Sequence, residues 1–136
     1  MTSPDRPLRF INPPGLPQPA GYSHVAEASG GKTIYISGQV ALDANRKLIG
    51  QNDLRLQTQQ VFTNLKTALE AVGADFNHVV KLNFYLLDIS QIQVVREVRD
   101  QFLNTHSPPA STAVEVRRLV MEDWLIEVDA SAVIPD

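Results

Sequence analysis

Apolar residues recur at every second position near the end of the chain. Over 124–134, every second residue beginning at Trp124 is apolar, whereas Glu127 and Asp129 belong to the other set. A period of two is that of a β-strand whose two faces meet different surroundings. The sequence therefore predicts a strand over 124–134, with a further strand over 112–119 before it.

A helical period precedes these strands in the middle of the chain. Asn52 or Asp53 can cap the start of this helix, and Gly73 suits its end. Apolar side chains recur there every three to four residues and form one stripe: Val61, Phe62, Leu65, Ala68, Leu69 and Val72.

A second helix is predicted to begin at Ser90, because Gln93 stands three residues later and completes a capping-box pattern. The pair Pro108-Pro109 ends any helix that reaches that far. Its apolar stripe consists of four residues: Ile92, Val95, Val98 and Phe102.

The first part of the chain predicts an arm and three strands. Residues 1–21 hold six of the nine prolines and are expected to form an extended, irregular arm. Residues 22–28 and 33–40 are expected to be strands, joined as a hairpin at Gly30-Gly31. Residues 47–49 form a weak third strand.

The near-continuous apolar run over 79–87 predicts a central strand with both faces occupied. The order ββ(β)αβαββ then predicts one α+β domain over residues 1–136, with a mixed sheet and two helices on one face. The opposite face of the sheet has too many apolar residues to face solvent and too many polar residues to form a hydrophobic core within one chain. A subunit interface is therefore predicted there. Its expected residues are Val79, Tyr85, Leu87, Leu125, Glu127, Asp129 and Val133.

Composition narrows the functional classes. The formal net charge of −3 argues against nucleic acid as a partner, since binding to phosphates normally requires a basic surface. The absence of cysteine excludes disulfides and thiolate metal sites. No apolar run is long enough to span a membrane, and no leader pattern is recognised, so a cytoplasmic protein without a membrane partner is expected.

Few residues suggest chemistry by pattern alone. The three histidines, His24, His78 and His106, lack metal-ligand spacing, so we expect surface or structural roles and no metal. The pair Ser37-Gly38 indicates either a strand that ends in a glycine bulge or a place where backbone approaches a ligand closely.

Two carboxylates, Glu127 and Asp129, are expected on one face of an otherwise apolar strand. Burying a carboxylate is costly unless it is paired or hydrogen-bonded. One interpretation is an interface ion pair with Arg117 or Arg118. The other is a general base with a raised pKa in a cleft between subunits.

Several segments, taken together, resemble the Rid family, also called YjgF or L-PSP. The resemblance covers roughly 22–134. It implies a chorismate-mutase-like fold and a homotrimer with the open sheet face inward, with ligand clefts built from that face between subunits. It also implies cofactor-free hydrolysis of reactive enamines and imines to 2-oxo acids and ammonia. The matching segments are Tyr35–Gln39, Gln57-Thr58 with Asn64 and Leu69, Val80-Lys81, Pro109–Val116 and Ile126–Ala130.

The resemblance also implies roles for individual residues. Tyr22 matches a tyrosine of the cleft, and Ser37 with Gly38 matches a pair that borders the ligand. Ala113 matches a position whose backbone N–H faces the ligand carboxylate. Glu127 matches the acidic residue that positions or activates water.

One departure from the family concerns the substrate carboxylate. In the deaminating members an arginine at the position of Ser111 binds the substrate carboxylate. A bidentate contact between arginine and a carboxylate strengthens binding roughly ten- to a hundredfold. Arg96 stands where those members often carry asparagine. From this different position its guanidinium can replace the missing arginine and bind substrate together with Ser111. Alternatively, Arg96, Glu97 and Arg99 form a solvated helix face.

Two functions remain open from the sequence. The first is an enamine or imine deaminase with Glu127 as its general base. The second is a non-catalytic trimer of the same fold that binds a small molecule or another protein. A ribonuclease is disfavoured by the acidic charge balance.

Overall fold

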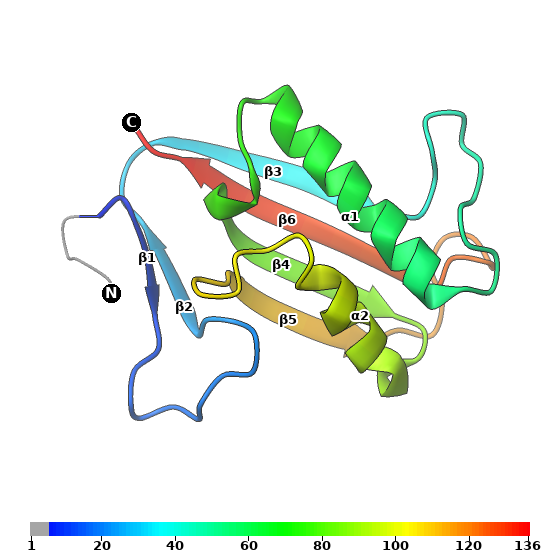
Figure 1. The fold of residues 1–136 in the computed structure, drawn as a ribbon, viewed down its shortest axis with the longest axis horizontal. Coiled ribbons are helices and arrows are strands. Elements are labelled where there is room, and N and C mark those ends of the chain that lie inside the picture. Colours follow the sequence, from blue (N-terminus) through cyan, green and yellow to red (C-terminus); the bar gives the residue numbers. More distant parts are fainter. Residues whose placement is uncertain (1–5) are drawn as a thin grey trace.

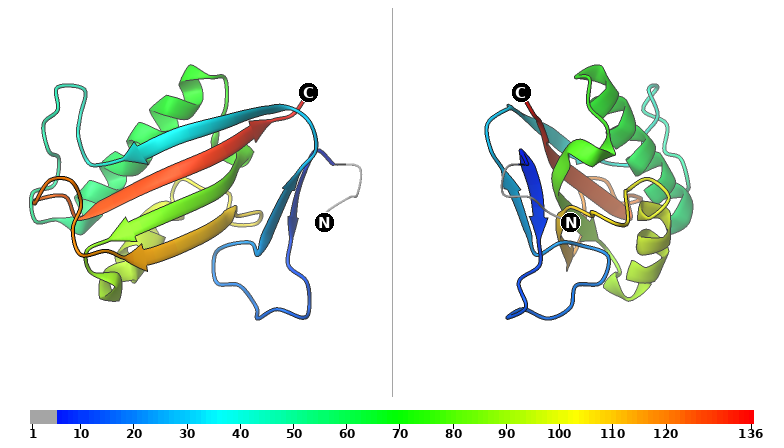
Figure 2. Two further views of the ribbon diagram at one scale, coloured as in Figure 1. Left: turned by 180° about the vertical axis from the view of Figure 1, so that it is seen from behind. Right: turned by 60° about the vertical axis from the view of Figure 1, so that its left-hand side comes forward.

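The structure is a computed structural model that describes residues 6–136. A mixed four-stranded sheet forms its centre, in the order β3-β6-β4-β5. Both α-helices, α1 (Leu54–Ala71) and α2 (Ile92–Arg99), lie on one face of this sheet (Figure 1), and the view from behind shows the other face uncovered (Figure 2). The four strands are β3 (Lys32–Gln39), β4 (Val79–Leu86), β5 (Ala110–Glu115) and β6 (Ile126–Ile134).

The alternation on β6 is confirmed and explains why the two sheet faces differ. Ile126, Val128 and Ala130 are buried beneath the helices, whereas Glu127 and Asp129 are half-buried on the opposite side. β6 lies between β3 and β4 and runs antiparallel to both, while β4 and β5 are parallel. The two middle strands therefore carry both the core and the open face.

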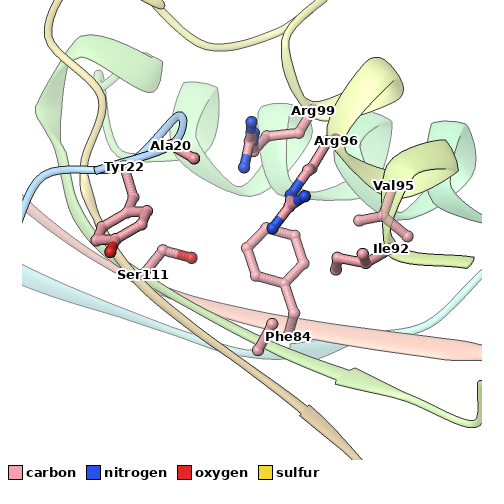
Figure 3. A pocket seen from close by; sticks show the side chains of 9 residues that line it. Ala20, Tyr22, Phe84, Ile92, Val95, Arg96, Arg99 and Ser111 are labelled. Atoms are coloured by element: carbon pink, nitrogen blue, oxygen red, sulfur yellow. The ribbon is translucent and has the colours of Figure 1, made fainter. Parts of the chain in front are cut away.

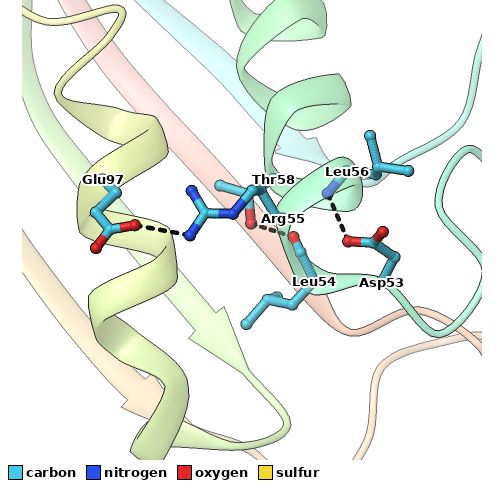
Figure 4. Close-up of polar contacts among 6 residues, drawn as sticks. All are labelled: Asp53, Leu54, Arg55, Leu56, Thr58 and Glu97. Carbon is cyan, nitrogen blue, oxygen red and sulfur yellow. Dashed lines mark hydrogen bonds and ion pairs between the residues drawn. The ribbon is translucent and has the colours of Figure 1, made fainter.

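α1 begins where the capping prediction placed it. The Asp53 carboxylate accepts a hydrogen bond from the backbone N–H of Leu56 at 3.0 Å (Figure 4), and Gly73 follows the helix with a φ of 75°. Phe62 of α1 is fully buried, and its ring lies 6.2 Å from that of Phe84 on β4. This contact helps to fix α1 on the sheet.

The predicted start of the second helix is wrong. Asp88, rather than Ser90, provides the cap, and it caps a 3-10 turn, η2 (Ile89–Gln91). α2 follows directly at Ile92 without a side-chain cap of its own. A second 3-10 turn, η1 (Phe76–His78), precedes β4.

The N-terminal predictions need two corrections. Residues 1–5 of the predicted arm lie outside the described residues, and the rest of the arm contains a strand, β1 (Leu8–Ile11). β1 pairs antiparallel with β2 (Val25–Ala28) in a small separate sheet. The chain does turn at Gly30-Gly31, but β2 and β3 do not form the predicted hairpin because each pairs with another strand.

Three smaller predictions also fail. Residues 47–49 form no strand, only an isolated bridge between Leu42 and Leu48. β5 ends at Glu115, four residues before the predicted end. Val79 is buried in the core rather than on the open face, because the register between β4 and β6 shifts just after it.

Candidate functional site

A cavity of about 200 Å³ lies between α2, β5 and the segment that leads into β2 (Figure 3). It opens on the helix side of the sheet, because Ser111 and Ala113 share that side with Leu82 and Phe84 in the β4–β5 register. We call it the α2 pocket. Its lining consists of Ala20, Tyr22, Phe84, Ile92, Val95, Arg96, Arg99, Ser111 and Ala113.

Four of the seven predicted site residues meet in the α2 pocket: Tyr22, Arg96, Ser111 and Ala113. The resemblance implied a cleft built from the face away from the helices, but these four lie on the helix side. Ser37, Gly38 and Glu127 do not line the pocket. The predicted site is therefore divided within one chain.

The charged residues of α2 do not form one solvated face. Glu97 points outward and accepts a hydrogen bond from Arg55 at 2.7 Å (Figure 4). Arg99, by contrast, is only 8% exposed, and its Nε donates to the Asp100 carboxylate at 2.9 Å. Sequence reasoning missed Arg99 as a pocket residue. One signal was available in the sequence. Arg99 lies four residues after Val95 and three before Phe102, a spacing that places it on the same helix face as these two apolar residues.

The segment before β2 closes one side of the pocket. Gly21 adopts a φ of 77°, and a Cβ added there would lie 3.2 Å from the guanidinium carbon of Arg99. Ser23 fastens this segment, because its backbone N–H donates to the Pro109 carbonyl at 3.0 Å and its hydroxyl donates to the Pro108 carbonyl at 2.6 Å. Tyr22 is thereby held beside β5.

The other predicted residues gather on the open face. The β3–β6 register shifts between Ile36 and Gln39, so Ser37 and Gly38 form the expected bulge. A Cβ added at Gly38 would lie 2.8 Å from Cδ of Glu127, closer than real contacts allow. Within one chain the group close to this glycine is the Glu127 side chain, and the predicted approach of the backbone to a ligand stays a prediction.

The electrostatics of the open face are set by two neighbouring carboxylates. Partial burial, and secondly the charge of Asp129, raise the pKa of Glu127 above its usual value. Asp129 accepts hydrogen bonds from Asn83 at 2.8 Å and from the Tyr85 hydroxyl at 3.1 Å, and the latter bond raises the pKa of Tyr85. We call these four residues the open-face cluster.

The ion-pair interpretation of the two carboxylates does not hold within one chain. No ion pair in residues 6–136 includes Glu127 or Asp129. Arg118 instead donates from Nε to the neighbouring Leu119 carbonyl at 3.2 Å. The predicted ion pair was one at an interface, so it stays a prediction, as does the role of Glu127 as a general base.

The histidines take no part in either group. His24 contacts the Pro17 carbonyl at 2.7 Å, and His78 accepts a hydrogen bond from the Asp75 backbone at 3.0 Å. In the part of the chain that the structure describes, no three histidine or acidic side chains are grouped so as to hold a metal ion. Nor does any helix there have the length and apolar character that crossing a membrane requires.

Comparison with known proteins finds a family model and several relatives that this chain matches. Residues 16–134 match the family model described as endoribonuclease L-PSP. A RutC family protein of Pyrococcus horikoshii is 39% identical over 117 residues, which covers 85% of this chain and 90% of the relative. A 2-iminobutanoate/2-iminopropanoate deaminase of Dermatophagoides farinae is 34% identical, covering 78% of this chain and 82% of that protein.

A solved structure agrees over nearly the whole length. It is a Rid family protein of unknown function from Yersinia pestis, with a TM-score of 0.84 and 36% sequence identity. The match covers 95% of this chain and all of that one. The chain is therefore similar both to one relative that is named as a deaminase and to a Rid family structure of unknown function.

Proposed function

This chain belongs to the endoribonuclease L-PSP family, also called Rid or YjgF, and on that premise we propose that it hydrolyses small imines and enamines. The products are an oxo compound and ammonia, and no cofactor takes part. The reaction occurs in a cleft between copies of the chain. One copy supplies the α2 pocket and the next supplies Glu127.

The main support for this proposal is that the predicted site residues lie in two separate regions of one chain. The α2 pocket and Glu127 lie on opposite faces of one sheet, so a single chain cannot bring them together. The open face also displays apolar surface, because Tyr35 is 82% and Val114 is 41% exposed. A cyclic assembly that seats this face against a neighbour covers the surface and completes the site. The assembly we propose is a homotrimer.

Glu127 is the general base in the proposed reaction. Water adds to the carbon of a protonated C=N group, and Glu127 accepts one proton from that water. The same carboxyl then returns that proton to the nitrogen of the addition product. As the C–N bond breaks, the carboxylate accepts the hydroxyl proton, the C=O bond forms, and the departing ammonia takes up this proton as ammonium. A raised pKa suits this double role, since it brings the carboxyl closer to the pH at which it works.

The pocket side orients the substrate. Tyr22 and Ser111 offer hydroxyl groups to it, and the backbone N–H groups near Ala113 and Gly38 are the proposed donors to its anionic end. β5 is an edge strand of the four-stranded sheet, so part of its backbone lies outside the sheet ladder. Such donors are available to a ligand.

A second candidate function is binding without catalysis. Ser111 stands where the deaminating members carry arginine, and serine provides no charge. The α2 pocket nevertheless remains a formed cavity. Its small volume suits a small molecule rather than a nucleic acid strand, which disfavours cleavage of RNA in this pocket.

The test uses 2-iminopropanoate and 2-iminobutanoate, generated in place by an amino-acid oxidase. We expect the purified protein to accelerate formation of the oxo acid over buffer. Glu127→Gln and Ser111→Trp, which fills the pocket, are each expected to abolish that acceleration. Neither variant alone distinguishes a shared site from one within a chain.

Co-expression of the two inactive variants makes that distinction. In a cyclic assembly formed at random from equal amounts, about a quarter of the sites combine an intact pocket with an intact Glu127. Activity near a quarter of wild type is therefore expected. No recovery despite mixed assemblies contradicts a shared site. If the wild type shows no turnover and Glu127→Gln leaves binding of 2-oxobutanoate unchanged, the binding function replaces the deaminase.

A further inference from the structure

Two arginines line the α2 pocket, and none of its described lining residues is acidic. Arg96 and Arg99 stand three residues apart on α2, a spacing that makes them neighbours on the helix surface. Figure 3 shows both side chains extending from α2 toward the cavity. Like charges this close repel each other, and an anion between them removes that repulsion.

The acidic residues of α2 and of its C-terminal cap leave this positive charge largely uncompensated. Glu97 is engaged outside the pocket by Arg55, at 2.7 Å. Asp100 meets Arg99 through Nε, and the Asp100 side chain is itself 47% exposed. No ion pair within residues 6–136 includes Arg96. The pocket therefore has a positive wall.

Arg99 is unusual for its burial. More than nine-tenths of this residue is inaccessible, and Gly21 places backbone directly against its guanidinium. Burying a cation is costly unless a counter-charge or several hydrogen bonds accompany it. A single half-exposed carboxylate at Nε offsets only part of that cost. An anionic ligand at the terminal nitrogens would offset the rest.

We infer that Arg96 and Arg99 form a carboxylate-binding subsite on α2. Planar guanidinium groups match the two oxygens of a carboxylate, which serine at position 111 cannot do. The inference rests on the proposed function only for identifying the bound acid as the imine substrate or its oxo product. Binding of the carboxylate itself follows from the pocket.

The remaining lining defines the rest of the ligand. Phe84, Ile92, Val95 and Ala113 give the pocket an apolar wall beside the two charges. Its volume of about 200 Å³ within one chain lies below the roughly 300–1,000 Å³ of drug-sized sites, so it suits a small ligand. The pocket thus fits a small carboxylic acid with an apolar side chain.

Calorimetric titration of the assembled protein with benzoate and with 2-oxobutanoate tests the subsite. Arg96→Gln and Arg99→Gln are each expected to weaken binding about ten- to a hundredfold. Arg55→Gln is the matched control, since it removes an arginine that contacts α2 on its outer side. This control is expected to bind like the wild type. Benzamide, which lacks the charge, is expected to bind at least tenfold more weakly than benzoate.

Three results would overturn the inference. They are unchanged benzoate affinity in the arginine variants, equal affinity for benzamide and benzoate, and tighter binding of inorganic phosphate than of benzoate. If Arg99→Gln fails to fold, Arg96→Gln on the partly exposed side decides alone. Arginine-dependent binding without imine turnover refutes the deaminase while leaving this subsite intact.

Discussion

The α2 pocket and the open-face cluster use the same strands in opposite ways. The pocket rests on the hydrophobic core, because Phe84 and Val95 belong to both. The open-face cluster of Asn83, Tyr85, Glu127 and Asp129 is half-buried and held by two hydrogen bonds to one carboxylate. One region is complete in a single chain, whereas the other has the polar groups of a site but no covering layer.

The difference arises from the period of the strand. Consecutive residues of β4 point to opposite faces, so Phe84 serves the pocket and Tyr85 serves the open face. A substitution at one of them should leave the other region largely unaffected. Neighbouring positions therefore provide matched tests of whether the two regions are separate in one chain.

The largest effect is expected for Phe84→Ala. This side chain is only 3% exposed and lies 6.2 Å, ring to ring, from Phe62. Its removal leaves a cavity in the core and at the pocket wall, and should lower the free energy of unfolding by about 3–5 kcal/mol. Denaturant unfolding at a fixed protein concentration measures the change.

Tyr85→Ala is the matched change on the other face. It removes a side chain of similar size from a half-buried position, so it should cost much less than Phe84→Ala. Equal losses for the two variants would contradict the separation of the faces.

The second largest effect is expected for Gly38→Ala. The added methyl overlaps the Glu127 side chain, which must then move away from its present position. A displacement of about 1 Å at a catalytic group can reduce the rate about a hundredfold. Steady-state measurement of imine turnover, with thermal unfolding in parallel, detects a loss of rate without a comparable loss of stability.

Gly15→Ala is the control for this substitution. A Cβ at Gly15 meets nothing within 4 Å, so neither rate nor stability should change appreciably. Full activity of Gly38→Ala would show that the position of Glu127 beside the bulge has no bearing on catalysis.

The sequence predicted those features that local pattern determines. The alternation on β6 and the cap at Asp53 depend on residues close in the chain, and both are confirmed. The partner of β2 could not be predicted in this way. Gly30-Gly31 specifies a turn, but which strands pair depends on contacts between distant residues.

The candidate site was predictable in part for the same reason. The strand period separated Glu127 from the core, but it gave no sign that Ser111 and Ala113 line a pocket on the helix side. The charge pattern of the helix suggested, as one alternative, that Arg99 lies on a solvated face. Its burial depends on Gly21, nearly eighty positions earlier, and no local pattern records that contact.

A moderate effect is expected for Tyr85→Phe within the open-face cluster. The change removes the hydroxyl that donates to Asp129 at 3.1 Å and leaves the bond from Asn83. Loss of one hydrogen bond to a charged group should cost about 1–2 kcal/mol. Chemical denaturation measures it, and the same change in an Asp129→Asn background should cost less. An equal cost in both backgrounds would mean that the hydroxyl acts elsewhere.

The smallest effect is expected for Glu127→Gln, and its sign distinguishes a site residue from a structural one. The pKa of Glu127 is raised in the folded state, so the folded chain binds this proton more tightly than the unfolded chain. The resulting stability is complete below the unfolded pKa and is lost as the pH rises through the folded pKa. The wild type should therefore match Glu127→Gln in acid and be less stable than the variant at neutral pH. Thermal unfolding across that range tests this, with the exposed Glu122→Gln as the control. A Glu127→Gln variant that is less stable than wild type at neutral pH would show that the carboxylate stabilises the fold. The expected result, a more stable variant, shows that the carboxylate is retained at a cost in stability, as a catalytic base is.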